Sequence, residues 1–351
     1  MSDGTKRSVI PSASALQARA VTDRLEAGVL ASAPASSDPR ARRLAYFAAV
    51  LACFGWGSLY TAAKIATGEV TGLMISFNRS TIATLILVAI VVARAGGPRP
   101  GFALLVETVR SARWGAVQFG IINFAGTSVL AMLAQQYLPA SVNGLVNNLG
   151  PLWLSIWAAT TGGAGRPVFL ILGSVIAAIG VSGVLLGDEL LGSDVTSLPA
   201  PTSATWVGVA LSLSGSVLIA YQNYLARRVV RGIDPVALTA AGAAIGSLAT
   251  GAVLAVGIGG SFDGYATVSM RTVLALGWLG TFATAFNFTL WTYALSVLPV
   301  ARIANLQYIV PPLSVVAGFV VLGEPVGPGL LAGAVAILGG IFLAQRGATR
   351  D

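Results

Sequence analysis

From Arg43 onward, the chain alternates between long apolar runs and short polar connections. Each run has about the 20 residues that a helix needs to cross roughly 30 Å of hydrocarbon at about 1.5 Å per residue. We expect transmembrane spans at residues 44–65, 72–93, 114–136, 140–160, 168–187, 206–226, 235–258, 272–294, 300–322 and 328–345. The pattern predicts an all-α integral membrane protein with ten transmembrane helices.

Part of this pattern occurs twice. Residues 137–167 align with residues 297–327 without a gap. The helix-breaking positions coincide in the two copies: Leu138-Pro139 with Leu298-Pro299, Pro151 with Pro311, and Gly163 with Gly323. Sequence identity is low, so the placement of these residues carries the evidence. A repeated helical module with a proline at the same depth is typical of secondary transporters.

The repeat divides the chain into two modules of five spans. We expect the first five-helix repeat at residues 43–187, an extracytoplasmic linker at 188–205, the second five-helix repeat at 206–346, and a C-terminal tail at 347–351. Residues 1–42 are rich in Ser, Ala, Arg and Pro and contain four acidic residues, which predicts a disordered cytoplasmic tail. The acidic residues argue against the alternative, an organellar transit peptide.

The positive charges predict the orientation in the membrane. With a cytoplasmic N-terminus, most Lys and Arg residues face the cytoplasm, and Lys64 and Arg271 lie outside. Because five is odd, the second repeat must be inverted, and equivalent connections should exchange sides. Arg166 follows the fourth span, whereas Arg302 lies between the eighth and ninth spans, as inversion requires. We predict two inverted repeats in the cell membrane with both termini cytoplasmic.

The composition excludes several other classes of protein. Hydrophobic residues make up 55% of the chain and charged residues 10%, whereas roughly a quarter of residues are charged in soluble domains. The net charge of +8 is spread over short connections, so we expect no nucleic-acid partner. The chain has no His and one cysteine, Cys53, and it lacks a Walker-type phosphate loop. We therefore expect no disulfide, metal or cofactor.

Several motifs resemble the EamA-type transporters of the drug/metabolite transporter superfamily. They are Trp56-Gly57-Ser58 with Lys64, Arg79, Leu138-Pro139-Ala140 with Pro151, Leu298-Pro299 with Pro311, Arg227-Arg228, and Leu322-Gly323-Glu324. The resemblance covers residues 44–346 and implies ten helices in two inverted halves, a substrate cavity between the halves, and alternating access. It departs from the family at residues 161–165, where members usually have Gly-Glu. In this chain, only Glu324 of the second repeat can take the role that this Glu has in the family.

The prolines indicate where the cavity lies. Pro151 and Pro311 have no N–H, so they free the carbonyl groups of Asn147 and Gln307, four residues earlier. Free carbonyls at this depth are tolerated where protein or a water-filled cavity satisfies them. Asn143 lies one turn before Asn147 and extends the polar stripe. We interpret these residues as a cavity lining; the alternative is that the amides join helices by hydrogen bonds.

Other polar side chains within the spans are further candidates. Arg79 lies deep in the second span, where it is either a clamp for a substrate carboxylate or phosphate, or part of a structural pair with an acid such as Glu324 or with carbonyls. Lys64, at the outer end of the first span, is expected to anchor at the membrane interface. Three more residues complete the candidate lining: Trp56, Asn223 and Asn287.

Glycines four residues apart indicate close contacts between helices. Gly183 with Gly187, Gly242 with Gly246, and Gly329 with Gly333 form such pairs. We expect these contacts within the chain, and a homodimer is the alternative.

The sequence as a whole favours a carrier that moves small metabolites across the lipid bilayer, such as exported amino acids. The first alternative is an integral-membrane enzyme acting on lipid intermediates, for which the His-free spans offer no nucleophile with a base. The second is a receptor or assembly subunit, for which the loops are too short. The sequence does not decide between proton antiport, exchange and facilitated efflux.

Overall fold

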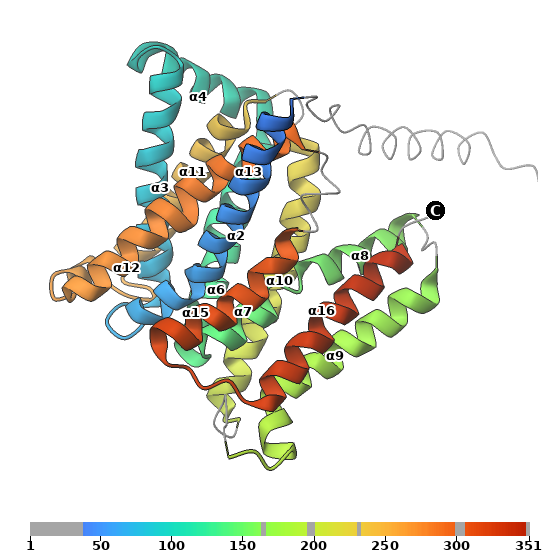
Figure 1. Cartoon of the computed structure of the whole chain (residues 1–351). Coiled ribbons are helices and arrows are strands. Elements are labelled where there is room, and N and C mark those ends of the chain that lie inside the picture. The colour runs from blue at the N-terminus through green and yellow to red at the C-terminus, as the bar shows by residue number, and fades with distance from the viewer. Residues whose placement is uncertain (1–37, 163–165, 195–200, 230–232, 299–305, 349–351) are drawn as a thin grey trace, which may run out of the picture.

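Helices form the regular secondary structure of the chain (Figure 1). The computed structural model describes residues 38–162, 166–194, 201–229, 233–298 and 306–348, and none of these residues belongs to a strand. Nearly all of the predicted tail at residues 1–42 lies outside the described residues. Within its last positions, α2 already begins at Pro39, because the carboxylate of Asp38 accepts a hydrogen bond from the Arg40 N–H at 2.9 Å and caps the helix.

The helices follow one another along the two repeats. The first repeat contains α2 (Pro39–Ala66), α3 (Gly72–Arg94), α4 (Pro98–Ala112), α5 (Trp114–Phe119), η1 (Gly120–Thr127), α6 (Ser128–Tyr137), α7 (Ala140–Asn147), α8 (Gly150–Gly162) and α9 (Pro167–Leu190). The second contains α10 (Ser203–Val229), α11 (Pro235–Ala255), η2 (Phe262–Tyr265), α12 (Met270–Gly280), η3 (Thr281–Phe286), α13 (Asn287–Val297), η4 (Gln307–Ile309), α15 (Val310–Ala317), η5 (Gly318–Leu322) and α16 (Pro328–Ala348).

Eight helices of the described chain are long and apolar enough to cross a membrane. They coincide with all the expected spans except the fourth and the ninth. The fourth is two short helices, α7 and α8, with a turn at Asn148 and Leu149 between them. The ninth is described from Leu306 onward, because residues 299–305 lie outside the described residues, and it contains the apolar stretch Gln307–Leu322, in which α15 lies between η4 and η5. The chain is a multi-pass membrane protein in which a turn interrupts the fourth segment and the described part of the ninth changes from one helix type to another.

The interruptions follow from the two aligned prolines. Pro151 is the second residue of α8, and Pro311 is the second residue of α15. A proline is tolerated in the first turn of a helix, because the N–H groups there have no partner within the helix. Pro151 therefore lies at the start of a new helix after the turn, and Pro311 lies at the aligned position where η4 continues into α15.

A second pair of irregular segments supports the repeat. The third segment of each repeat contains a π-helical stretch, η1 in the first and η3 in the second. The alignment of residues 137–167 with 297–327, extended backwards without a gap, places these stretches at equivalent positions. Such stretches widen the helix and are frequent at functional sites.

The connection after the second span contains a helix that the apolar pattern does not predict. This helix, α4, mixes apolar and charged residues and is too short for a membrane span. It packs on α3, where a Cβ atom added to Gly101 would lie 2.6 Å from the Cα atom of Val92. Its fully buried residues are Gly101 and Thr108, and Leu105 and Ala112 pack partly buried against the core, so a search for long apolar runs misses this helix.

Helices α9 and α16 form an antiparallel pair at one side of the molecule (Figure 1). Their backbones touch at glycines: a Cβ atom added to Gly180 would lie 2.8 Å from the carbonyl oxygen of Gly333, and one added to Gly187 would lie 2.8 Å from the Cα atom of Gly329. Gly242 and Gly246 likewise receive the side chains of Phe119 and Phe124. These small-residue pairs act within the chain; an additional homodimer contact stays a prediction.

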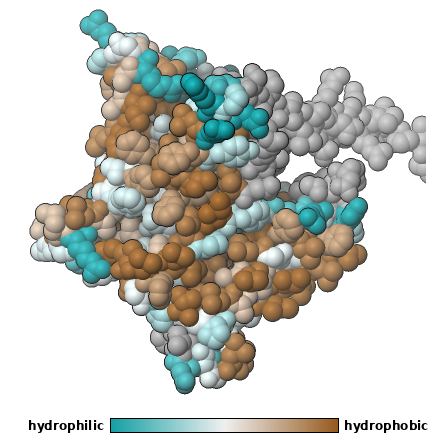
Figure 2. Space-filling model, in the orientation of Figure 1, coloured by the Kyte–Doolittle hydropathy of each residue, from teal (hydrophilic) through white to brown (hydrophobic). Residues whose placement is uncertain are grey.

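The outer surface is apolar as well as the core. Hydrophobic side chains cover most of the face in Figure 2, and hydrophilic ones gather near its edges. Leu85, Leu248 and Val335 are 67%, 74% and 72% exposed. Side chains of this size at these exposures are unfavourable in water and favourable against lipid tails.

The contact between α9 and α16 generates a test with a control on the same helix. An alanine at position 333 would place its Cβ atom 2.5 Å from the Val184 nitrogen, so Gly333→Ala must push the backbones apart. We expect a loss of about 1–3 kcal/mol and a lower melting temperature in detergent. Gly339 has nothing within 4 Å, so Gly339→Ala should be neutral or slightly stabilising. Equal melting temperatures of the two variants would contradict this packing.

Candidate functional site

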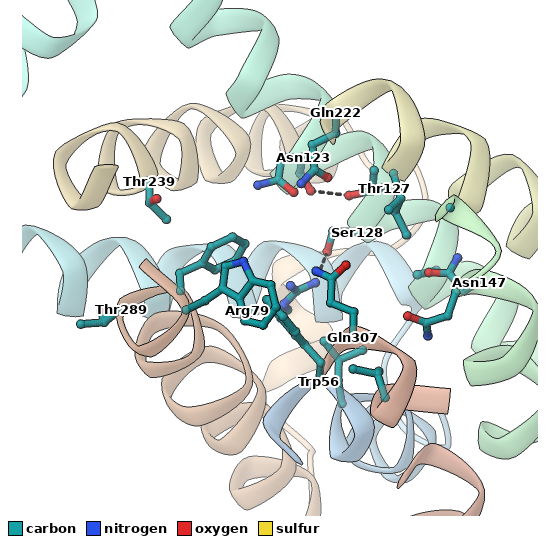
Figure 3. Close-up of a pocket in the computed structure, with 18 of the residues that line it drawn as sticks. Trp56, Arg79, Asn123, Thr127, Ser128, Asn147, Gln222, Thr239, Thr289 and Gln307 are labelled. Carbon is teal, nitrogen blue, oxygen red and sulfur yellow. Dashed lines mark hydrogen bonds between the residues drawn. The ribbon is translucent and has the colours of Figure 1, made fainter. Parts of the chain in front are cut away.

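A large cavity opens between helices of both repeats. Its volume is about 880 Å³, within the range of small-molecule sites. The first repeat supplies lining residues from α2, α3, η1, α6, α7 and α8, and the second supplies them from α10, α11, α13, η4, α15 and α16. Its polar side chains include Arg79, Asn123, Thr127, Ser128, Asn147, Gln222, Thr239, Thr289 and Gln307 (Figure 3).

Six of the residues expected at the site line this cavity. They are Trp56, Arg79, Asn147, Pro151, Gln307 and Pro311. Both interrupted segments therefore reach the same space from opposite repeats. Asn147 is held firmly: its Oδ1 atom accepts a hydrogen bond from the Tyr60 hydroxyl at 3.2 Å, and its Nδ2 donates to the Ser212 carbonyl at 3.2 Å. Gln307 points into the cavity near Ser128 and Arg79 (Figure 3).

Two other expected residues do not line the cavity. Asn143 is fully buried, donates to the Ala131 carbonyl at 3.0 Å and to Gln135 at 2.8 Å, and accepts from Ser212 at 2.8 Å. Asn287 is also fully buried and donates to the Ala52 carbonyl at 2.9 Å.

For Asn143 and Asn287 the cavity prediction is wrong, and the alternative of amides joining helices describes them. The side chain of Asn223 lies outside the described residues.

Arg79 is fixed in the cavity wall by hydroxyl groups. Its Nε atom donates to Thr284 at 2.6 Å, and its Nη1 donates to Ser128 at 3.0 Å. The expected pair between Arg79 and Glu324 is not formed, since Glu324 binds elsewhere, and Arg79 has no salt bridge to any described acidic residue. The guanidinium group therefore faces the cavity without a counter-charge from the described chain.

An aromatic group lies beside Arg79. Trp56 meets Trp291 with ring centroids 5.0 Å apart and Phe288 with centroids 6.2 Å apart, both in edge-to-face geometry. All three residues line the cavity. The site thus offers a cation, amides and hydroxyls next to an apolar wall.

Lys64 and Glu324 both bind the tight turn between α6 and α7. The Lys64 ammonium donates to the carbonyls of Gln135 and Leu138 at 3.1 and 2.8 Å, at the end of α6. The Glu324 carboxylate accepts from the backbone N–H groups of Ala140 and Ser141 at 2.6 and 3.0 Å, and from the Ser141 hydroxyl at 2.7 Å.

Each charge therefore complements the helix dipole that it meets. The ammonium group of Lys64 is bound to carbonyls at the end of α6, and its position at the membrane interface stays a prediction.

Contacts between the repeats close the end of the molecule at which Glu324 lies. The Glu69 carboxylate accepts a hydrogen bond from the Ser269 N–H at 2.6 Å, and bonds from the Ser269 side chain and N–H lower the pKa of Glu69. The Tyr265 hydroxyl donates to the Met74 carbonyl, and Thr71 donates to the carbonyl of Gly259. Burial raises the pKa of Tyr265 above its ordinary value, so it stays a donor at neutral pH.

At the opposite end, the lining reaches the ends of α3 and α13 and the start of α11. Arg94 and Asp234 form a salt bridge of 3.2 Å there, and both line the cavity. The exposed fractions of their side chains, 56% and 27%, show that this end meets solvent.

Several lining residues were not singled out from the sequence. Asn123, Thr127 and Ser128 lie in or next to η1, whose π-helical geometry turns them to the cavity. Asn123 aligns with Ala283, so comparing the two repeats does not reveal it. An isolated Asn within an apolar span is the available signal, and it does not say which way the side chain points.

Comparisons with known proteins agree with this architecture. A sequence profile described as "EamA-like transporter family" matches residues 43–186 and again residues 206–345. An "Uncharacterized transporter" of Archaeoglobus fulgidus is 23% identical over 295 residues, which cover 83% of this chain and 95% of that protein. A "Probable terminal-alkyne amino-acid exporter" of Streptantibioticus cattleyicolor is 25% identical over 304 residues, which cover 86% and 93% of the two chains.

A solved crystal structure has the same fold. It superposes with a TM-score of 0.58 at 21% sequence identity and covers 86% of this chain and 97% of the other. The double match of the family profile confirms the resemblance seen in the sequence motifs. The chain belongs to the EamA-like transporter family, and it is a membrane transporter rather than an enzyme.

Proposed function

We propose that this protein moves small metabolites, such as amino acids, out of the cell by alternating access between two inverted five-helix repeats. The observation that carries the proposal is the cavity itself, into which both proline-interrupted segments project. In this assignment α7 with α8, and η4 with α15 and η5, complete ten membrane segments. The exporter named among the relatives supports amino acids as the first substrates to test.

The charges and the cavity together suggest one state of the transport cycle. With both termini cytoplasmic, the Arg94–Asp234 end faces the cytoplasm and the Glu324 end faces outward. The structure then represents an inward-facing state, closed outside by bonds between the repeats. Transport requires these outer bonds to break while the cytoplasmic ends of α3 and α11 approach α13.

Gln307 offers the clearest test of the cavity as the transport path. We expect Gln307→Leu to lower counterflow of labelled amino acid in proteoliposomes about tenfold, a loss of about 1.4 kcal/mol, because an apolar side chain cannot hydrogen-bond to a polar substrate. Gln118 is exposed on α5 and does not line the cavity, so Gln118→Leu is the matched control. Unchanged counterflow in Gln307→Leu would remove this residue from the path.

Asn147→Leu is expected to act differently. It also removes a lining amide, but it leaves the Tyr60 hydroxyl and the Ser212 carbonyl without their partner. We expect lower transport together with a lower melting temperature, by about 1–3 kcal/mol of stability. A transport defect without a stability defect would show that the amide contacts substrate alone.

The orientation can be tested with single cysteines. Cys53→Ser removes the one native cysteine and retains a donor for the Leu306 carbonyl. In that background, a membrane-impermeant maleimide should label exposed Thr267→Cys on intact cells, and should label Ser111→Cys on α4 after permeabilisation alone. The reverse labelling pattern would place the termini outside.

Glu324 tests the outer closure. Glu324→Gln replaces a charged acceptor of three hydrogen bonds, and we expect a lower melting temperature corresponding to about 1–3 kcal/mol. Glu107 accepts a bond from Ser111 within exposed α4, so Glu107→Gln is the control. If both variants melt at the wild-type temperature, the carboxylate does not hold the outer end closed.

A further inference from the structure

We infer that the cavity recognises one carboxylate group of its substrate, bound by Arg79, with an apolar body against Trp56, Phe288 and Trp291. This inference rests on the proposed transport function and adds the chemical class of the substrate. It assigns Arg79 as the residue that determines specificity.

The first argument is the unused donor capacity of Arg79. A guanidinium group has five N–H donors. Two bonds are made, to Thr284 and Ser128, and the remaining donors have no acceptor among the described residues. The side chain points into the space between the repeats (Figure 3). A carboxylate matches the planar fork of a guanidinium group and binds it through two parallel hydrogen bonds.

The second argument is how the two hydroxyl groups are used. Thr284 donates its own proton to the Leu279 carbonyl at 2.7 Å, and Ser128 also accepts from Ser76 at 2.7 Å. Their lone pairs are therefore directed at Arg79. They fix the guanidinium group in place without neutralising it, which is the arrangement of a binding group rather than of a structural ion pair.

The third argument is the balance of charge in the described lining. Asp234 is the one acid there, and Arg94 pairs with it at the solvent-exposed end. The interior of the cavity therefore keeps a single positive charge from Arg79. A single charge suits one carboxylate group, whereas a phosphate dianion needs further cations and a cation without a carboxylate needs an acid.

Asn123 supplies a second binding group. Its side chain is 8% exposed and lines the cavity, and its Nδ2 atom has no hydrogen-bond partner. A buried amide donor without a partner is costly, and an acceptor on a bound molecule would satisfy it. The apolar wall beside Trp56 accommodates the remainder of the substrate.

The test compares four probes that share an aromatic body. They are 3-phenylpropionate, its carboxamide 3-phenylpropanamide, 2-phenylethylammonium and phenyl phosphate, added to the purified full-length protein in detergent. Binding is followed by tryptophan fluorescence and by the shift in melting temperature. We expect 3-phenylpropionate to bind wild-type protein at least about tenfold more tightly than each of the others.

Variants connect the preference to Arg79. Arg79→Gln should remove the preference for carboxylate over carboxamide, and Arg79→Lys should retain part of it because the charge remains. Arg110 is exposed on α4 outside the cavity, so Arg110→Gln controls for the loss of one positive charge. If Arg79→Gln does not fold, the Arg79→Lys variant and the binding of the four probes to wild-type protein still test whether Arg79 recognises the carboxylate.

Several results would overturn the inference. The inference is wrong if carboxylate and carboxamide bind equally, or if the ammonium or phosphate probe binds more tightly than 3-phenylpropionate. It is also wrong if 3-phenylpropionate does not bind at millimolar concentration, or if Arg79→Gln keeps the preference for carboxylate. Failure of the transport proposal looks different: counterflow of labelled amino acids would be absent from proteoliposomes, whatever the probes show. Counterflow that carboxamide inhibits as well as carboxylate would leave transport standing and remove the role of Arg79.

Discussion

Backbone polar groups inside an apolar layer need partners, and this constraint shapes the centre of the protein. Pro151 and Pro311 each end one run of helical hydrogen bonds and begin another, so helix ends lie at membrane depth instead of at its surface. At the α6–α7 turn, Lys64 binds the carbonyls of one helix end, and Glu324 binds the N–H groups of the other. At the ninth segment, the Gln307 carbonyl cannot bond to Pro311 and accepts a hydrogen bond from the Val310 N–H instead.

The same constraint links the two repeats to each other. Glu324 of the second repeat binds the N-terminus of α7 in the first, and Asp188 of the first binds the Gly329 N–H at the start of α16 in the second, at 2.6 Å. Each repeat thus caps a helix of the other repeat with a carboxylate, and the two carboxylates lie at non-equivalent positions of the repeats. The α9–α16 pair is tied by Asp188 and by backbone contact at glycines, whereas α7 is tied by side-chain hydrogen bonds. The second kind of contact is easier to break and reform, so motion is expected around α7 and α15 rather than between α9 and α16.

Local rules explain which parts of this design the sequence predicts. The proline positions, the lining amides Asn147 and Gln307, and the glycine contacts follow from rules that act within one turn of helix or at close helix crossings. The direction in which a side chain points does not follow from such local rules. Asn143 and Asn147 lie one turn apart, yet the side chain of Asn143 bonds to α6 and α10, whereas that of Asn147 bonds to α2 and α10 and also reaches the cavity edge. Lys64, Arg79 and Glu324 were expected as anchors or partners, but their bonds depend on distant backbone groups and hydroxyls that sequence spacing does not place.

The charge of Arg79 also bears on how transport is driven. In the empty carrier this guanidinium group has lost part of its water and has no acidic partner among the described residues, which costs free energy. In the proposed complex, a bound carboxylate offsets that cost at Arg79. The acids near the C-terminal ends of α9 and η5, Asp188 and Glu324, are already bound to helix N-termini. On this proposal, the carrier changes state more readily with substrate than without it, and we expect exchange of substrates to be faster than return of the empty cavity.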